Sequence, residues 1–224
     1  MKKIILVLFL FFLCYACYFI YKHTEDTKLD IIAIGDEIAN NPYINNLNND
    51  FIKDDYHLND LINIIKYNEE IEVNGKNESI HQLLKKADIL IISIGMNDIY
   101  YKLNEDTFEI YTYLNDLINN YETLLKLISH YDYKEVYILN YYNISNKNTD
   151  LFTYINYKLN KLTTSYNYTY LDISKILNNN SNYYLKNSDF SLNNKGYCQI
   201  FNLMVEKTKK TWYNIKCVYY YDLY

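Results

Sequence analysis

The stretch DILIISIGMND, residues 88 to 98, decides the fold class of this protein. From Ile89 to Gly95 it is apolar apart from one serine, as is typical of a β-strand that is covered on both faces. Such strands belong to parallel sheets packed between helices. The apolar run ends at Gly95, and Asn97 and Asp98 follow directly after the next residue. The stretch therefore predicts an α/β protein with polar side chains at the end of a buried strand.

The rest of the chain alternates apolar runs with helical patterns. Besides residues 88–94, strands are predicted over residues 30–35, 71–73, 135–140 and 168–173. Helices are predicted where apolar residues recur three and four positions apart, over residues 106–131, 150–164 and 194–212. Residues 40–70 are interpreted as a loop followed by a helix. This order predicts a three-layer α/β/α sandwich with a five-stranded parallel sheet, whose sites lie at the carboxyl ends of its strands.

The composition is typical of a single domain with a sizeable core. The chain has 224 residues, half of them apolar, a net charge of -5 and no arginine. Nucleic-acid binding requires clustered Lys and Arg, so this class of function is excluded. The 29 tyrosines accompany many Lys, Asn and Ile residues, a pattern typical of AT-rich coding sequence. Aromatic runs such as residues 219–224 are therefore weak evidence for a surface that stacks on sugars.

The amino-terminal segment has the character of a membrane anchor. Two lysines precede residues 4–21, which carry no charge and are about as long as the shortest membrane-spanning helices. A cleaved signal peptide is the alternative, although no A-x-A site follows the apolar run. We divide the chain into an anchor or signal segment, residues 1–24, and one domain, residues 25–224. Lys2 and Lys3 predict that this domain lies outside the cytoplasm.

The cysteines and glycines give further expectations. Cys14 and Cys17 lie in the apolar segment, while Cys198 and Cys217 remain open to two interpretations, a disulfide or two buried thiols. No cysteine spacing suggests a metal site. Glycine is rare, and we expect it only where the backbone needs positive φ or close approach. The four glycines are Gly35, Gly75, Gly95 and Gly196, the first three each at a predicted strand end.

Four short blocks together resemble the SGNH or GDSL hydrolases. They are GDE at 35–37, NGKN at 74–77, IGMND at 94–98 and DFSLNNKGY at 189–197. VYILNYYNI at 136–144 is also similar to a segment of membrane-anchored, lipase-like members from Gram-positive bacteria. The resemblance spans about residues 29–207. It implies a flavodoxin-like sheet, hydrolysis of esters of lipids or acylated glycans without a cofactor, and a place on the outer side of a bacterial cell membrane.

The resemblance also assigns site residues, and here the chain departs from the family. Glu37 occupies the position of the family's nucleophilic serine, while Asn97 and Gly75 match the oxyanion donors. In the last block Ser188 and Ser191 occupy the Asp and His positions. A shift by one residue puts Asp189 and Leu192 there instead, so neither alignment provides an imidazole.

Four histidines occur elsewhere in the chain. Of these, His81 is expected to lie nearest the site because it begins the helix after the predicted second strand, although a capping or solvated role explains it more simply. His130 is expected at the opposite edge of the sheet, and His57 in the insertion after residue 40 is the weaker candidate.

Three functions follow from these residues. Without a serine and an imidazole, we expect a catalytically silent binding or scaffolding domain whose ligand is an acyl ester, lipid or glycan. The alternative is an active esterase that uses Glu37 as base or acyl acceptor and Asn97 to polarise the carbonyl. A third hypothesis places Ca²⁺ or Mg²⁺ between four acids at strand ends, Asp36, Glu37, Asp98 and Asp189.

Overall fold

The computed structural model describes residues 15, 30–36, 51–53, 55–73, 75–103, 107–143, 147–178, 180–185 and 191–208. Its main sheet has five parallel strands in the order β2-β1-β5-β6-β7. These strands are β1 (Ile31–Gly35), β2 (Phe51–Ile52), β5 (Ile89–Ser93), β6 (Glu135–Leu139) and β7 (Thr169–Leu171). The predicted α/β architecture with a five-stranded parallel sheet is confirmed.

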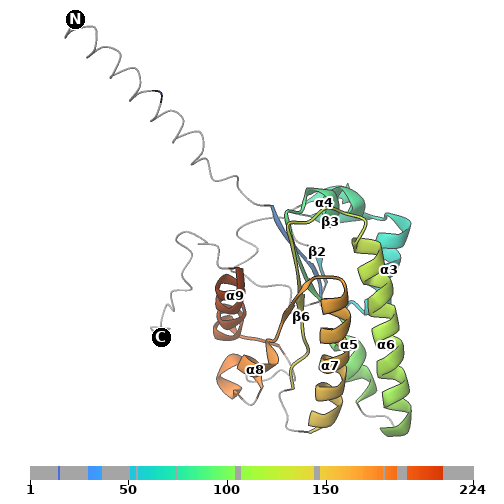
Figure 1. Cartoon of the computed structure of the whole chain (residues 1–224), viewed down its shortest axis with the longest axis vertical. Coiled ribbons are helices and arrows are strands. Elements are labelled where there is room, and N and C mark those ends of the chain that lie inside the picture. The colour runs from blue at the N-terminus through green and yellow to red at the C-terminus, as the bar shows by residue number, and fades with distance from the viewer. Residues whose placement is uncertain are drawn as a thin grey trace, which may run out of the picture.

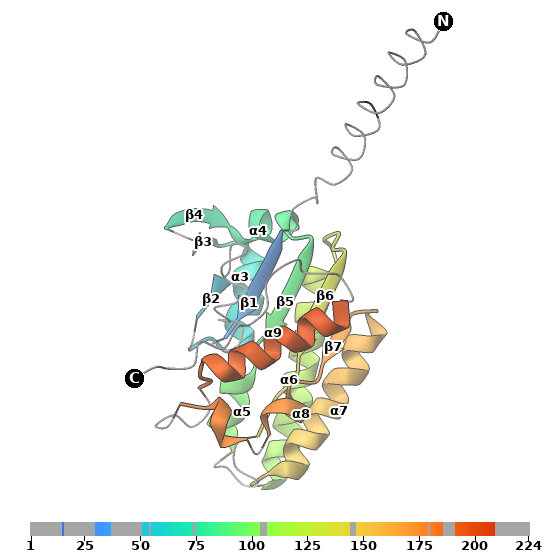
Figure 2. The same ribbon diagram turned by 90° about the vertical axis from the view of Figure 1, so that its left-hand side faces the viewer.

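Helices cover both faces of this sheet, which explains why the central strands are largely apolar. Helix α9 (Asn194–Thr208) lies on one face, while α3 (Leu58–Tyr67), α6 (Thr107–Ile128) and α7 (Thr149–Ser165) lie on the other (Figure 1). Figure 2 shows α9 crossing in front of the strands, with α6 behind them. All five residues of β5 are buried, and burying each large aliphatic side chain contributes about 1.5–3 kcal/mol.

The strand register brings the carboxyl ends of the central strands together. Gly35 of β1 pairs with Ser93 of β5, and Ile92 of β5 pairs with Ile138 of β6. We call the edge of the sheet at which these strands end the carboxyl edge, and the edge at which they begin the amino edge. At the amino edge, the amide of Asp88 donates to Asp30 and the amide of Lys134 donates to Asp88, both at 2.8 Å.

The prediction that residues 71–73 form the second strand of the main sheet is wrong. Strand β3 (Glu70–Val73) pairs antiparallel with β4 (Lys76–Ser79) in a separate hairpin. Its residues alternate between exposed and buried, as expected of a strand that is covered on one face alone. The second strand of the main sheet in chain order is β2, which lies at the edge of the sheet. Its two residues are too short a run to stand out within residues 40–70.

The helical patterns are confirmed where the structure describes them. Helices α6 and α7 match the patterns predicted over 106–131 and 150–164, and α9 matches the one that begins at residue 194. Two short helices, α5 (Met96–Lys102) and α8 (Ser174–Leu177), follow the ends of β5 and β7, and α4 (Ile80–Lys86) precedes β5.

Two expectations fall partly outside the described residues. Cys198 is a buried free thiol in α9, whereas Cys217 lies beyond the described part of the chain. No helix among the residues that the structure describes is long and apolar enough to cross a membrane. Apart from Tyr15, residues 1–24 are not among them, so the anchor or signal segment remains a prediction.

Candidate functional site

A buried aspartate joins the ends of the two central strands at the carboxyl edge. Asp36 follows Gly35, and its amide donates to the carbonyl of Ser93 at 2.8 Å. The Ser93 hydroxyl donates to Asp36 Oδ1 at 3.1 Å, and the amide of Met96 lies 3.4 Å from Oδ2. Because a buried carboxylate needs such donors, Asp36 holds the turn after β1 against the turn after β5.

Gly35 and Gly95 make this close approach sterically feasible. Gly35 has φ +134°, and a Cβ there would lie 1.7 Å from the Ser93 carbonyl oxygen. Gly95 has φ +102° and packs against Tyr141, whose hydroxyl donates to the carbonyl of Ile94 at 3.1 Å. Burial raises the pKa of Tyr141 well above its usual value, so this hydroxyl stays protonated and remains a donor.

Asn97 and Asp98 bind the loop that joins β2 to α3. The Asn97 amide nitrogen Nδ2 donates to the carbonyl of Tyr56 at 3.0 Å, and Asp98 Oδ2 accepts from the amide of Leu58 at 2.9 Å. The side chain of Asp98 is 9% exposed. One function of the IGMND block in this chain is therefore to hold the β2–α3 loop at the carboxyl edge.

The β2–α3 loop also brings an imidazole to this edge. Nδ1 of His57 lies 3.4 Å from Oδ1 of Asp98, which is an ion-pair distance. The His57 side chain is 44% exposed, and the ring of Tyr101 meets it edge-on with centroids 6.5 Å apart. The sequence ranks His57 behind His81, whereas the structure brings His57 to the carboxyl edge through the short strand β2. The pair of apolar residues before the amphipathic pattern of α3 was the available signal.

Most of the other site residues predicted from sequence are not placed by the structure. Glu37, Ser188 and Asp189 lie outside the described residues. Ser191 is partly buried, and its carbonyl accepts from the amide of Leu185 at 3.0 Å. The assignments of these positions to the family's Ser, Asp and His remain predictions.

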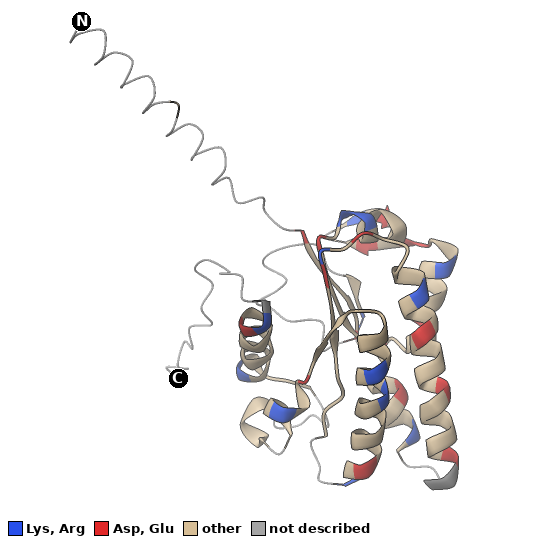
Figure 3. Cartoon of the chain, in the orientation of Figure 1, with Lys and Arg blue, Asp and Glu red and all other residues tan. Residues whose placement is uncertain are grey.

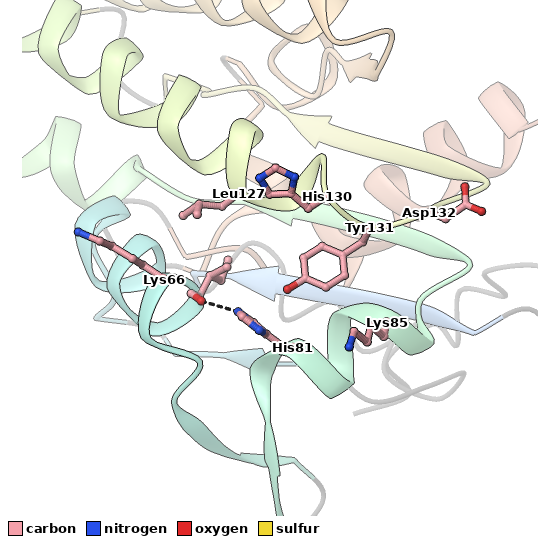
Figure 4. Close-up of a pocket in the computed structure, with 8 residues that line it drawn as sticks. Lys66, His81, Lys85, Leu127, His130, Tyr131 and Asp132 are labelled. Atoms are coloured by element: carbon pink, nitrogen blue, oxygen red, sulfur yellow. Dashed lines mark hydrogen bonds between the residues drawn. The ribbon is translucent and has the colours of Figure 1, made fainter.

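Gly75 and His81 lie at the amino edge, so the prediction that they lie near the site is wrong. Gly75 is in the turn of the β3–β4 hairpin, and His81 is in α4, whose carboxyl end leads into the start of β5. His81 Nε2 lies 2.7 Å from the carbonyl of Ile65 in α3, and its ring meets that of Tyr131 edge-on (Figure 4). The His81 ring therefore connects α4 to α3 at the amino edge. The prediction failed because residues 71–73 belong to the hairpin and not to the main sheet.

A pocket of about 490 Å³ surrounds His81. It opens between α3, α4 and the end of α6, where Lys66 and Lys85 lie in the last turns of their helices. Positive side chains at these helix ends complement the partial negative charge of the carbonyl groups. Its lining residues are Ile65, Lys66, His81, Lys85, Leu127, His130, Tyr131 and Asp132. The expectation that His130 lies at the edge opposite the site is thus confirmed.

Charges elsewhere lie mainly on the outer surfaces of the helices, as on α6 and α7 (Figure 3).

At the end of β7, burial acts to raise the pKa of Asp172, but hydrogen bonds from Ser174, Lys175 and Asn140 outweigh it and hold the pKa below its usual value. Asn140 also donates to the Tyr170 hydroxyl at 2.9 Å. These contacts fasten the turn after β7 to the end of β6.

The chemical capacity of the carboxyl edge follows from these groups. The Ser93 hydroxyl is buried and donates to Asp36, which makes it unsuitable as a nucleophile. An imidazole beside a buried carboxylate is suited to accept a proton. For a cation, no three His, Cys, Asp or Glu side chains cluster among the described residues. Because Glu37 and Asp189 are not among these residues, the Ca²⁺ or Mg²⁺ site remains a hypothesis.

Comparisons with known proteins agree with this architecture. No family sequence model and no curated protein sequence matches the chain. An acetylxylan esterase from Geobacillus stearothermophilus matches with a TM-score of 0.60 at 13% identity, over 82% of this chain and 95% of the esterase. A lipase from a goat rumen metagenome matches with a TM-score of 0.62 at 18% identity, over 83% and 98% of the two chains.

A GDSL-like lipase from Parabacteroides merdae, described as putative, matches with a TM-score of 0.58 at 14% identity, over 81% of this chain and 96% of that one. At such identities the likeness concerns the fold and not the chemistry. The chain has the fold of the SGNH/GDSL esterases and lipases.

Proposed function

We propose that this chain binds an acyl ester or an acylated glycan at the carboxyl edge of its sheet and lacks the serine chemistry of SGNH/GDSL hydrolases. The observation that carries this proposal is the hydrogen-bonded arrangement around Asp36, Ser93 and Asn97. The residue that follows Asp36 is Glu37, at the position where the family has its nucleophile. The turns after β1 and β5 are held together as a ligand site at this edge would require, but the group that would form an acyl-enzyme is replaced.

The class of ligand follows from the proteins of the same fold. One acts on acetylxylan and others are lipases, so an ester of a sugar or a lipid is the ligand class that they share. In this chain, the exposed ring of Tyr101 beside His57 provides an apolar face for a sugar ring or an acyl chain.

The absence of serine chemistry rests on charge and on proton transfer. An ionised Glu37 accepts hydrogen bonds and donates none, and its charge would oppose an oxyanion formed beside it. Ser191 occupies the position of the family's histidine and has no basic nitrogen. A binding or scaffolding domain is therefore the first function that we propose.

A second function, ester hydrolysis without a serine nucleophile, is favoured by one specific observation. From the sequence, this alternative has Glu37 as the base or acyl acceptor and Asn97 as the group that polarises the carbonyl. The pair of His57 and Asp98 supplies a different base at the same edge, 3.4 Å apart.

We further propose that the domain lies outside the cytoplasm, tethered to a bacterial membrane by residues 4–21. The charge-free length of this segment and the preceding lysines support an anchor, with secretion after cleavage as the alternative. Residues 22–29 then form a tether of at most about 30 Å, since an extended chain spans roughly 3.3–3.6 Å per residue. This tether would enter the domain at the amino edge and leave the carboxyl edge open to ligand.

Ligand binding tests the first function. The full chain, isotope-labelled in detergent micelles, is titrated with an acetylated xylo-oligosaccharide. We expect shifts in the amide signals of residues 55–58 and 95–101 and none in those of residues 80–86, which serve as the control at the amino edge. Shifts confined to residues 80–86, or no shifts, would contradict the proposal.

A serine-directed fluorophosphonate tests the missing chemistry. We expect no labelling of the native chain and labelling of the triple variant Glu37→Ser, Ser188→Asp, Ser191→His. The single variant Glu37→Ser is the matched control, because it supplies a hydroxyl without a base. Labelling of the native chain at a serine would overturn the claim that serine chemistry is absent.

A further inference from the structure

We propose that His57 is a general base that activates water for ester hydrolysis at the carboxyl edge, and that Asp98 is its positioning residue. This inference rests on the proposed function, because the ester must bind at that edge. It differs from the family's arrangement in the origin of the base. The imidazole comes from the loop after β2 and the carboxylate from α5, whereas the resemblance puts both groups near residue 190.

The carboxylate is held in place independently of the imidazole. Asp98 Oδ2 accepts from the amide of Leu58 at 2.9 Å, which leaves Oδ1 facing Nδ1 of His57 at 3.4 Å. With its hydrogen on Nδ1, toward the carboxylate, the neutral ring has its lone pair on Nε2, as the proposal requires. No residue in the described part of the chain contacts Nε2 by a hydrogen bond, and the exposed side chain gives water access to it.

The loop that carries the imidazole is fixed at several points. The amide of Lys53 donates to Gly35, and the amide of Tyr56 donates to Lys53. Asn97 binds the carbonyl of Tyr56, the residue directly before His57. The base is therefore held beside the Asn97 position, where the resemblance places the polarised carbonyl group. Such fixed geometry is a requirement for general-base catalysis.

His57 also begins helix α3. There its side chain and that of Asp60 form a capping box, in which the amide of His57 donates to the carboxylate of Asp60 at 2.9 Å. The amides of Asp60 and Leu61 donate to the backbone carbonyl of His57. Gln at position 57 keeps a side-chain acceptor for this cap, which makes His57→Gln the suitable test of the imidazole.

The reaction balances with water as the one co-reactant. His57 Nε2 takes a proton from water as the water oxygen bonds to the acyl carbon, and the carbonyl electron pair moves to the carbonyl oxygen. When the tetrahedral intermediate collapses, the bond from carbon to the alcohol oxygen breaks, and the leaving oxygen takes the proton from the imidazolium. The products are one carboxylic acid and one alcohol, and no covalent enzyme intermediate forms.

The test measures hydrolysis of p-nitrophenyl acetate by the full chain in detergent micelles, between pH 5 and pH 9. We expect His57→Gln to lower the enzymatic rate by about 100-fold or more, within the range of general-base catalysis. The matched control is His81→Gln, which removes the imidazole at the amino edge and should leave the rate unchanged. An unchanged rate in His57→Gln would overturn the proposal.

The split between kcat and KM separates positioning from a purely structural role of Asp98. Asp98→Asn keeps an oxygen that can accept from the amide of Leu58 but removes the carboxylate beside Nδ1 of His57. We expect its kcat to fall while its KM and its urea midpoint stay near the native values. An unchanged kcat, or a loss of activity matched by a loss of stability, would show that the carboxylate acts on folding alone.

The failures of the two proposals are distinguishable. If the acetylated oligosaccharide shifts the amide signals of the carboxyl edge but the native chain hydrolyses no ester above background, this inference is wrong and the proposed function stands. If no such shifts occur, the proposed binding function itself is wrong. Equal loss of activity in His57→Gln and His81→Gln would indicate nonspecific imidazole chemistry and would also overturn the inference.

Discussion

His57 and His81 each lie at the start of a helix, yet the two ends of the sheet use them differently. His81 Nε2 lies 2.7 Å from the carbonyl of Ile65, so its ring joins two helices at the amino edge. His57 lies 3.4 Å from the carboxylate of Asp98 and keeps an exposed side chain at the carboxyl edge. The comparison teaches that the partner of an imidazole, and not its place along a helix, decides whether it is available for chemistry.

The polar groups around the two histidines differ in the same way. At the carboxyl edge, Asp36 and Asp98 are buried and bind backbone amides of other segments. At the amino edge, charges such as those of Lys86 and Glu78 pair at the surface. We therefore expect substitutions at the carboxyl edge to cost more free energy of unfolding than matched ones at the amino edge.

The largest difference is expected between two glycines. Gly35→Ala places a Cβ 1.7 Å from the Ser93 carbonyl oxygen at a positive φ and should lower the free energy of unfolding by about 4 kcal/mol or more. Gly75→Ala also has positive φ but no atom within 4 Å, and should cost about 1 kcal/mol. Urea unfolding and the yield of soluble protein measure both. Equal losses would break the comparison.

Two acids give the next largest difference. Asp98→Ala leaves the buried amide of Leu58 without its acceptor and should cost about 2–3 kcal/mol. Glu78→Ala removes a surface ion pair with Lys86 and should cost less than about 1 kcal/mol. The measurement is the urea midpoint at pH 7, with the m-value as a check on two-state behaviour. A larger loss in Glu78→Ala would contradict the ranking of the two ends.

Two buried tyrosines sharpen the account of the carboxyl edge. Tyr141→Phe removes the donor to Ile94 and should cost about 1 kcal/mol. The hydroxyl of Tyr121 is buried without a hydrogen-bond partner among the described residues, so Tyr121→Phe should be neutral or stabilising by up to about 1 kcal/mol. Thermal unfolding of the two variants, which lose the same atom, separates them. A loss in Tyr121→Phe would reveal a partner for that hydroxyl.

The smallest effect is a pH dependence at Asp172. Its folded-state pKa is lowered, so its contribution to stability is present above the pKa of an unfolded aspartate, about 3.9, and is lost as the pH falls through the folded-state value. Since the side chain is partly exposed, the contribution should stay below about 1 kcal/mol. Urea midpoints between pH 6 and pH 2.5 should show a smaller acid dependence in Asp172→Asn. An identical dependence in both proteins would exclude this role.

The long apolar runs and helical periodicities predicted most of the fold. The apolar run that begins at residue 89 predicted a strand covered on both faces, and all five residues of β5 are buried. The error at residues 71–73 arose because a short apolar pattern does not specify its partner strand. That choice depends on hydrogen bonds with residues 76–79, which pair with it in the hairpin. Because of the same error, Gly75 and His81 were predicted at the carboxyl edge, whereas they lie at the amino edge.

The sequence by itself determined that a buried strand ends in Gly95, Asn97 and Asp98, and that an acid stands where a serine nucleophile would be expected. Only the tertiary structure decided which histidine faces these residues. A pairing between residues that lie 41 positions apart, such as His57 and Asp98, depends on strand order and on packing across the sheet. Local sequence patterns do not specify the strand order, because each segment can form its own strand or helix beside more than one neighbour.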